Sequence, residues 1–158
     1  MPFEFTILDA LQALRCPALD ALAVFFDYAG AHGEIWVAFS AVLLVFRRTR
    51  RAGLAMALAL GLYMLTGHCA LKPLFARPRP CDIRPAMLAL VARPHGWSFP
   101  SGHTASGFAA AFALWRQNRK LGVPALWLAA LIGFTRMYLY VHFPTDILGG
   151  VALGLALG

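Results

Sequence analysis

Residues 35–67 read IWVAFSAVLLVF-RRTRR-AGLAMALALGLYMLTG, two uncharged apolar runs on either side of four arginines. A helix needs about 20 residues to cross the hydrocarbon core of a bilayer. The helical pattern extends the first run back over residues 30–33 and the second run on toward Lys72. Arginine is costly inside hydrocarbon, so residues 47–51 are expected to form the turn between the two helices. The stretch therefore predicts a helical hairpin in a membrane.

The composition of the whole chain indicates the same class of protein. Of its 158 residues, 60% are hydrophobic and 13% are charged, whereas soluble domains average about 45–50% and about 25%. An aromatic content of 13% excludes a disordered chain. The three cysteines are odd in number and lack metal-ligand spacing, which argues against a disulfide scaffold, and we interpret them as apolar filler.

Three further apolar runs follow the hairpin, at residues 104–115, 123–141 and 147–158. The last run is about a dozen residues long against the about 20 that a span needs, so we expect it to be cut short at Gly158. Residues 73–100 are polar and rich in proline, which predicts a connection with at most a short helix over residues 86–92.

Two shorter apolar stretches precede the hairpin. Residues 3–14 repeat apolar side chains at helical spacing, and residues 21–26 lie between two aspartates. Each stretch is too short to cross a membrane, so we interpret both as amphipathic helices lying in the interface. One broken span over residues 7–28 is the alternative.

These runs predict an all-α fold, a polytopic membrane helix bundle with five to six transmembrane helices. The bundle forms a single domain over residues 1–158. Short amphipathic interfacial helices occupy residues 1–30, and residues 31–158 form the transmembrane core.

The formal charge of +7, from 14 Lys and Arg against 7 Asp and Glu, indicates an anionic partner. So apolar a chain leaves little wet basic surface for nucleic acid, and that class of partner is excluded. The basic turns at residues 47–51 and 116–120 contain no acid and lie two spans apart, so they share one side of the membrane. The positive-inside rule makes that side cytoplasmic and places all seven acidic residues on the extracytoplasmic side.

Three polar clusters fall at helix ends on the extracytoplasmic side: Lys72-x6-Arg79-Pro80, Pro100-Ser101-Gly102-His103 and Arg136-x5-His142-x3-Asp146. The cations Lys72, Arg79 and Arg136 would repel one another unless an anion joined them, and guanidinium groups match the oxygens of a phosphate. Ser101 and Gly102 precede a helix, whose free backbone N–H groups add anion affinity. The clusters therefore predict a phosphate-binding site.

Two histidines supply reactivity beside this site. His142 and Asp146 are four residues apart at a helix start, so the carboxylate can accept one ring N–H and leave the other nitrogen as a nucleophile toward phosphorus. His103 can protonate the departing oxygen, and water then hydrolyses the phospho-histidine. Three cations suffice to neutralise the phosphoryl oxygens, so the sequence predicts no metal and no cofactor.

Other charged residues of this side have simpler interpretations. A basic residue at a helix end usually extends its charge to the water, and Arg77, Arg84 and Arg93 are assigned that role. Asp82 is interpreted as a turn residue or as a partner of one of these arginines. The remaining histidines are assigned structural or surface roles; they are His32, His68 and His95.

The three motifs, spanning residues 72–146, resemble the signature of the type 2 phosphatidic acid phosphatase superfamily, which includes membrane lipid phosphatases, glucose-6-phosphatase and the vanadium haloperoxidases. The resemblance implies that His142 is the nucleophile, Asp146 its orienting carboxylate and His103 the acid for the leaving group. It implies a phosphate-binding role for five residues, namely Lys72, Arg79, Ser101, Gly102 and Arg136. One departure is Thr135, which stands where the third motif usually has serine and keeps the hydroxyl.

The resemblance implies a metal-independent phosphatase in a bacterial inner membrane, with its active site on the extracytoplasmic side and membrane lipids around it. The favoured substrate is undecaprenyl diphosphate, with phosphatidylglycerol phosphate, phosphatidic acid and lipid A phosphate as alternatives. A non-catalytic lipid-phosphate binder or transporter is the competing class, although binding alone would not require the two histidines and the aspartate. A vanadate-dependent oxidase is disfavoured, because those members are soluble and the mean hydropathy here is +0.67.

Overall fold

The computed structural model describes residues 2–30, 33–87 and 90–158, and every regular element in these ranges is a helix. The elements in chain order are α1 (Pro2–Gln12), α2 (Pro17–Gly30), α3 (Glu34–Val45), α4 (Arg50–Tyr63), the π-helix η2 (Met64–Leu71), α5 (Lys72–Phe75), α6 (Pro80–Ile83), α7 (Gly102–Gln117), α8 (Arg119–Tyr138) and α9 (Pro144–Leu157). The predicted all-α class is confirmed.

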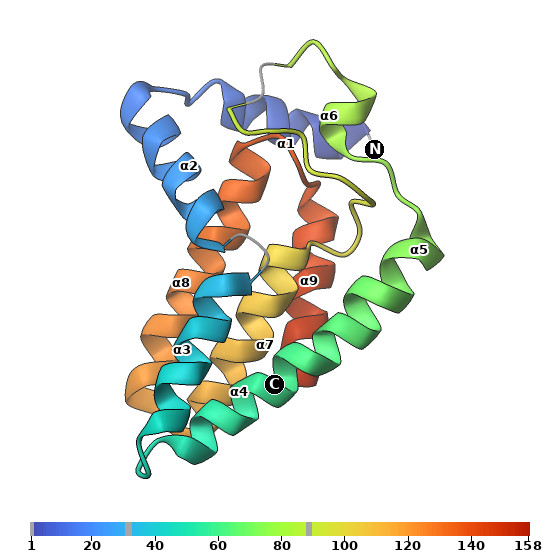
Figure 1. Ribbon diagram of the computed structural model, residues 1–158. Coiled ribbons are helices and arrows are strands. Elements are labelled where there is room, and N and C mark those ends of the chain that lie inside the picture. The colour runs from blue at the N-terminus through green and yellow to red at the C-terminus, as the bar shows by residue number, and fades with distance from the viewer. Residues whose placement is uncertain (1, 31–32, 88–89) are drawn as a thin grey trace.

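The two apolar runs around the arginine cluster form the helical hairpin α3–α4, as predicted (Figure 1). The two helices approach closely at Gly53, where a Cβ atom would stand 2.8 Å from the carbonyl oxygen of Ser40. The Ser40 hydroxyl donates a hydrogen bond to the Gly53 carbonyl at 2.8 Å, which links the two helices at this point. Beyond Tyr63 the helix continues through η2 and α5, so that Lys72 lies near the far end of one long helix.

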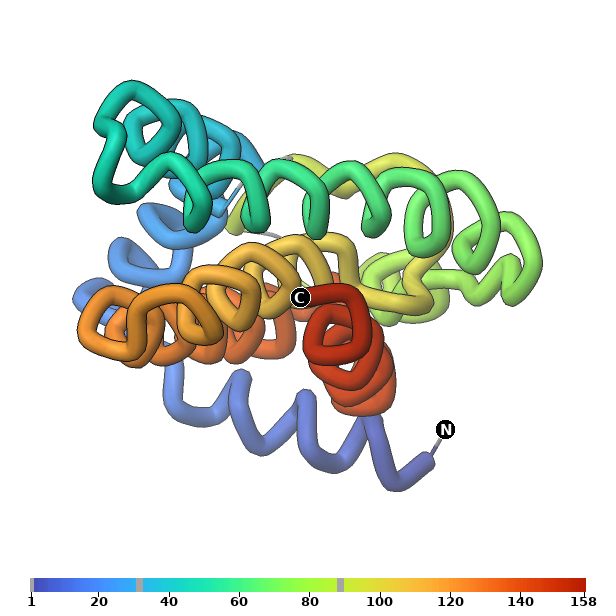
Figure 2. Tube along the Cα trace, turned by 90° about the horizontal axis from the view of Figure 1, so that it is seen from below, coloured from blue at the N-terminus to red at the C-terminus, as the bar shows by residue number. Residues whose placement is uncertain are grey.

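Helix α7 is the centre of the bundle and packs against α4, α8 and α9 (Figures 1 and 2). Its contact positions carry small side chains, which allow close helix packing in a membrane. The buried alanines of α7 are Ala105, Ala109, Ala110, Ala111 and Ala113. Gly150 of α9 also allows close helix packing, because a Cβ atom there would lie 2.9 Å from the carbonyl oxygen of Ser101. The first turns of α7 and α9 therefore lie side by side.

Helix α1 crosses one end of the bundle instead of running along it (Figures 1 and 2). Its apolar side is held by Phe5 and Leu8, which are buried with Tyr140 and Phe143. The Phe5 and Phe143 rings meet edge to face with centroids 5.3 Å apart. This end of the bundle carries the first turn of α9, so α1 covers the region in which the sequence places the chemistry.

The number of spans differs from the prediction of five to six. By length and apolar composition two helical stretches of the described chain can cross a membrane, Arg50–Ile83 and Arg119–Tyr138. The pair α2 and α3, bent by 53° at a short break, would make a third span. Helices α7 and α9 are apolar but are only 16 and 14 residues long. Helix α7 lies between the second motif and a basic turn, and the third motif fixes the start of α9.

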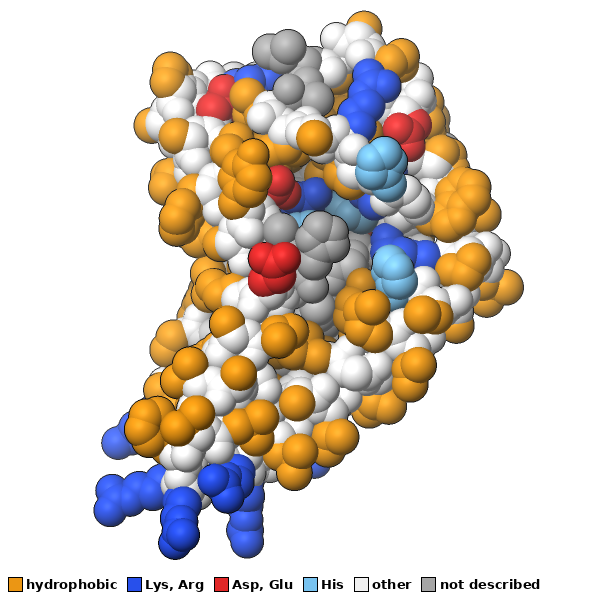
Figure 3. Space-filling view, in the orientation of Figure 1, with side chains coloured by type: hydrophobic (Ala, Val, Ile, Leu, Met, Phe, Trp, Pro, Cys, Tyr) orange, Lys and Arg blue, Asp and Glu red, His pale blue; other side chains and the backbone are white. Residues whose placement is uncertain are grey.

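The basic turns between α3 and α4 and between α7 and α8 lie at the same end of the bundle (Figure 1). Figure 3 shows Lys and Arg side chains gathered at that end and the acidic side chains in view lying farther up the molecule. In the long connection the short helix is α6, over Pro80–Ile83, and the described residues of the range 86–92, which allowed at most a short helix, are not helical. Pro80 explains the shift, because proline favours the first turn of a helix.

Candidate active site

His142 of the third motif lies in the turn between α8 and α9, and Asp146 lies in the first turn of α9. Tyr140 adopts a left-handed backbone (φ 60°), and the N–H groups of Val141 and His142 turn back to the Arg136 carbonyl at 3.1 and 3.3 Å. Asp146 is the third residue of α9, where its carboxylate accepts the Phe143 backbone N–H at 2.8 Å. One carboxylate oxygen thereby caps the helix and also faces the imidazole.

His142 and Asp146 form a buried hydrogen-bonded pair. Asp146 Oδ2 lies 3.4 Å from His142 Nδ1, and the side chains are 2% and 0% exposed. Ser98 joins them, since its hydroxyl donates to Asp146 Oδ2 at 2.5 Å and lies 3.3 Å from His142 Nδ1. An imidazole whose Nδ1 carries the proton toward this carboxylate has its lone pair on Nε2.

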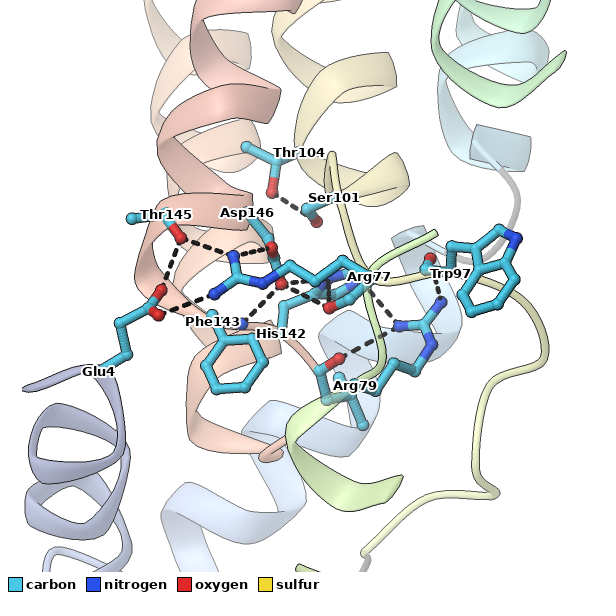
Figure 4. A network of polar contacts seen from close by, with 12 residues as sticks. Glu4, Arg77, Arg79, Trp97, Ser101, Thr104, His142, Phe143, Thr145 and Asp146 are labelled. Carbon is cyan, nitrogen blue, oxygen red and sulfur yellow. Dashed lines mark hydrogen bonds and ion pairs between the residues drawn. The ribbon is translucent and has the colours of Figure 1, made fainter. Parts of the chain in front are cut away.

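The other ring nitrogen of His142 faces Arg79. The distance from Arg79 Nη1 to His142 Nε2 is 3.0 Å (Figure 4). The guanidinium is held by the carbonyls of Val141 at 3.1 Å and Gly96 at 3.0 Å. Burial lowers the pKa of His142 well below its usual range, and the hydrogen bond to Asp146 opposes that shift. The imidazole is therefore neutral near pH 7, as a nucleophile must be.

Lys72 reaches the same region from α5. Its ammonium donates to the Trp97 carbonyl at 2.6 Å, and Arg79 Nη2 lies 3.3 Å from the same oxygen. Gly102 lies nearby, because a Cβ built there would stand 3.8 Å from Lys72 Cε and 2.7 Å from the Tyr63 hydroxyl. Glycine is thus required for the close approach of α7 to the two helical segments that carry Tyr63 and Lys72.

Ser101 precedes α7, and its backbone N–H donates to the Asp146 carbonyl at 3.0 Å. Its side-chain oxygen accepts the Thr104 hydroxyl at 3.0 Å. The expectation that the Ser101 backbone N–H is free for an anion is wrong, because this donor ties the first turn of α7 to α9. The bond instead joins the second motif to the third.

Arg136 and His103 are connected by an acid that the sequence reasoning left out. Asp27 of α2 makes an ion pair with Arg136, and its Oδ1 lies 3.9 Å from His103 Nε2. Arg136 is 1% exposed and close enough to His142 to act on its charge. The described structure thus gathers all eight predicted residues at the end of the bundle that α1 crosses.

Some contributing residues escaped the sequence reasoning. Arg77, expected to extend into water, instead binds Asp146 Oδ1 at 2.6 Å and Glu4 Oε2 at 2.7 Å, because a buried carboxylate is a stronger partner than solvent. Ser98 and Asp27 were also not singled out. The available signals were an acid inside apolar sequence for Asp27 and proximity to the second motif for Ser98. Asp82 accepts the Arg79 backbone N–H at 3.2 Å, the local role predicted for it.

A neutral imidazole lies between a buried carboxylate and a guanidinium, with further cations beside it, and these are the groups that phosphoryl transfer through a histidine requires. The chain belongs to the PAP2 superfamily, whose family model matches residues 48–158. It is a lipid phosphatase of that family.

Known relatives match nearly the whole chain. It is 29% identical to an undecaprenyl-diphosphatase of Sulfolobus acidocaldarius, over 96% of this chain and 73% of that protein. It is 30% identical to the undecaprenyl-diphosphatase BcrC of Bacillus subtilis, over 98% of this chain and 80% of that protein. The crystal structure of a transmembrane PAP2 type phosphatidylglycerolphosphate phosphatase from Bacillus subtilis superposes with a TM-score of 0.79 at 30% identity, over 99% and 81% of the two chains.

Proposed function

We propose that this phosphatase hydrolyses undecaprenyl diphosphate to undecaprenyl phosphate and inorganic phosphate through a phospho-histidine on His142. The observation that carries the mechanism is the buried line of contacts from Ser98 through Asp146 and His142 to Arg79. It gives the imidazole a defined proton on Nδ1 and a lone pair on Nε2 beside a phosphate-binding cation. Two of the relatives above are named for activity on undecaprenyl diphosphate, which supports the choice of substrate.

In the first step His142 Nε2 attacks the terminal phosphorus and the bond from phosphorus to the bridging oxygen breaks. Positive charge develops on the imidazole, and Asp146 stabilises it. Lys72, Arg79 and Arg136 bind the phosphoryl oxygens, together with the Ser101 hydroxyl and the Gly102 backbone N–H at the start of α7. His103 gives its proton to the departing oxygen.

In the second step water attacks the phospho-histidine. His103 accepts a proton from the water, the phosphorus–nitrogen bond breaks, and inorganic phosphate leaves with His142 restored. Neither step uses a metal ion, because the positively charged side chains stabilise the negative charge on the phosphoryl oxygens.

The membrane orientation follows from charge. The basic turns at residues 47–51 and 116–120 face the cytoplasm by the positive-inside rule, and the site at the opposite end opens toward the extracytoplasmic face of the inner membrane. A polyprenyl tail then lies in the bilayer while its diphosphate reaches the site at the interface.

Phosphate release in detergent from a panel of lipids tests this proposal. The panel contains undecaprenyl diphosphate, phosphatidylglycerol phosphate, phosphatidic acid and lipid A phosphate, with His142→Ala and His103→Ala as the inactive controls. We expect the highest kcat/KM for undecaprenyl diphosphate. A preference for phosphatidylglycerol phosphate, the substrate of the solved relative, would overturn the choice of lipid and leave the chemistry intact. Binding without release would instead indicate a lipid-phosphate binder or transporter.

A further inference from the structure

The two oxygens of the Asp146 carboxylate have different surroundings. Oδ2 lies on the side of His142, where it accepts hydrogen bonds from Ser98 Oγ and the Phe143 N–H and contacts His142 Nδ1. Oδ1 faces away from it and meets Arg77 Nη1 at 2.6 Å. A carboxylate held at both ends cannot rotate, so the residue on Oδ1 controls how Oδ2 meets the imidazole.

Arg77 is itself held on several sides (Figure 4). Its second terminal nitrogen binds Glu4 Oε2 at 2.7 Å, and Nη1 also lies 2.6 Å from the Thr145 hydroxyl. The guanidinium lies over the Phe143 ring, 4.2 Å from its centroid. Thr145 closes the group by donating to Glu4 Oε1 at 2.5 Å. The fork of a guanidinium can bridge two carboxylates in this way, which a lysine ammonium cannot reproduce.

The charges of this cluster explain why a second acid is needed. Arg77 alone would neutralise Asp146 and weaken its attraction for the imidazolium that forms when His142 attacks phosphorus. Glu4 balances the guanidinium, so the group of Glu4, Arg77 and Asp146 keeps one net negative charge beside His142. The Arg77 and Glu4 side chains are only 16% and 11% exposed, so water screens this balance weakly.

We propose that Arg77, anchored by Glu4 of α1, is a positioning residue that holds the Asp146 carboxylate with Oδ2 against His142. Helix α1 then contributes Glu4 to the positioning of the active-site carboxylate, in addition to packing across the end of the bundle. The proposal rests on the proposed function, because it assigns the role through the nucleophile His142.

Arg77→Met, Arg77→Lys and Glu4→Gln test the proposal, with phosphate release measured over a range of substrate concentrations. We expect Arg77→Met to lower kcat by about 100-fold, the cost of a small misplacement of a reacting group. KM and the inhibition constant of vanadate, a phosphate mimic, should stay close to wild type, because Arg77 does not bind the phosphate. Arg77→Lys should recover part of kcat, and Glu4→Gln should lower kcat by less than Arg77→Met.

Arg84→Met is the matched control. Arg84 also ties α1 to the bundle through a carboxylate, Asp9, at 2.8 Å, and also lies over an aromatic ring, that of Phe5, at 3.9 Å. Its hydrogen bonds in the described structure go to Asp9 and Tyr140 and not to Asp146, so we expect kcat near wild type. Equal losses in Arg77→Met and Arg84→Met would show a general loosening of α1 and overturn the proposal. So would a rise in KM with unchanged kcat. If Arg77→Met does not fold, the near-isosteric Glu4→Gln decides in the same way.

A measurement without turnover separates this proposal from the proposed function. The ring ¹⁵N signals of His142, assigned by their loss in His142→Gln, report which nitrogen carries the proton. We expect them to shift in Arg77→Met and Glu4→Gln and to stay in place in Arg84→Met. If the wild-type protein released no phosphate, the proposed function would fail while the ring signals still tested the positioning role. Unchanged signals in both variants would overturn that role.

Discussion

Asp146→Asn should abolish most of the activity while leaving the shape of the site unchanged. The carboxylate accepts from Arg77 Nη1 at 2.6 Å, Ser98 Oγ at 2.5 Å and the Phe143 N–H at 2.8 Å, with His142 Nδ1 at 3.4 Å. An amide has one oxygen for these donors. If its NH₂ group faces Arg77, two donors oppose each other. At the Oδ2 position the NH₂ group opposes the neutral Phe143 N–H, which is a weaker conflict than one with the charged guanidinium. The amide therefore turns the NH₂ group toward His142, which must then accept at Nδ1 and carry its proton on Nε2.

That tautomer has no lone pair for phosphorus, so the effect falls on the chemical step. From the comparable loss when the carboxylate of a catalytic triad is replaced by an amide, we expect kcat to fall by about 10³–10⁴-fold. This loss corresponds to about 4–5.5 kcal/mol in the barrier. KM should change little, because Asp146 does not bind the lipid.

The assay is phosphate release in detergent at saturating substrate, beside thermal unfolding of the same samples. Asp20→Asn is the control, since this carboxylate also pairs with an arginine, Arg15 at 2.9 Å, and lies on α2 outside the site. We expect a lower melting temperature for Asp146→Asn, because the half-buried Arg77 guanidinium loses a charged partner. A folded Asp146→Asn protein with kcat within about tenfold of wild type would refute the reasoning, since no orienting role would remain for the carboxylate.

Three further predictions follow from the site. Ser98→Ala removes one hydrogen bond to a buried carboxylate, worth about 1.5–3 kcal/mol, so kcat should fall by about 10–100-fold; unchanged turnover would contradict the role given to Ser98. Phosphate release should persist in excess EDTA, and loss of activity that added Mg²⁺ restores would contradict the electrostatic role of Lys72, Arg79 and Arg136. Burial lowers the pKa of His142 below the ordinary 6.5, so the imidazole stays neutral until the pH falls to that lowered value. We therefore expect the kcat/KM that depends on His142 to decline only below pH 6.5. A decline of kcat/KM centred above pH 6.5 would contradict this reasoning.

Much of the site could be predicted from the sequence, because its residues lie in short motifs at the ends of apolar runs. His142 and Asp146 are one helical turn apart, so the chain itself brings them together. Lys72 and Arg79 could be grouped with them by chemistry, since cations beside apolar helices need an anion. The helical class likewise followed from the uncharged runs on either side of residues 47–51.

The contacts that could not be predicted are those made between distant parts of the chain. Glu4 and Arg77 are separated by 73 residues, and their contact exists only because α1 crosses the end of the bundle beside α9. Asp27 meets Arg136 for a similar reason, through the packing of α2 on α8. The local sequence pattern does not show which acidic residue will contact which arginine from a distant part of the chain.

The prediction of five to six spans goes further than the two to three stretches that length and composition support, for a different reason. Apolar composition is shared by helices that cross a membrane and by short helices surrounded by other helices. Helix α7 is buried by α4, α8 and α9, so its alanine-rich sequence reflects packing on protein as much as contact with lipid. Length then separates the two kinds of helix, and helix ends are set by features such as Pro144 and the basic turns.

The central claim is that His142 attacks phosphorus, and trapping the covalent intermediate tests it most directly. The enzyme is mixed with undecaprenyl diphosphate labelled with ³²P in the terminal phosphate, denatured within milliseconds, and the labelled peptide is identified. We predict an acid-labile, base-stable label on His142 in the wild-type enzyme and no label in His142→Ala. The His103→Ala variant should carry more label if the substitution slows hydrolysis of the phospho-histidine more than its formation. Phosphate release by the wild-type enzyme with no label on His142, or label on another residue, would contradict the account.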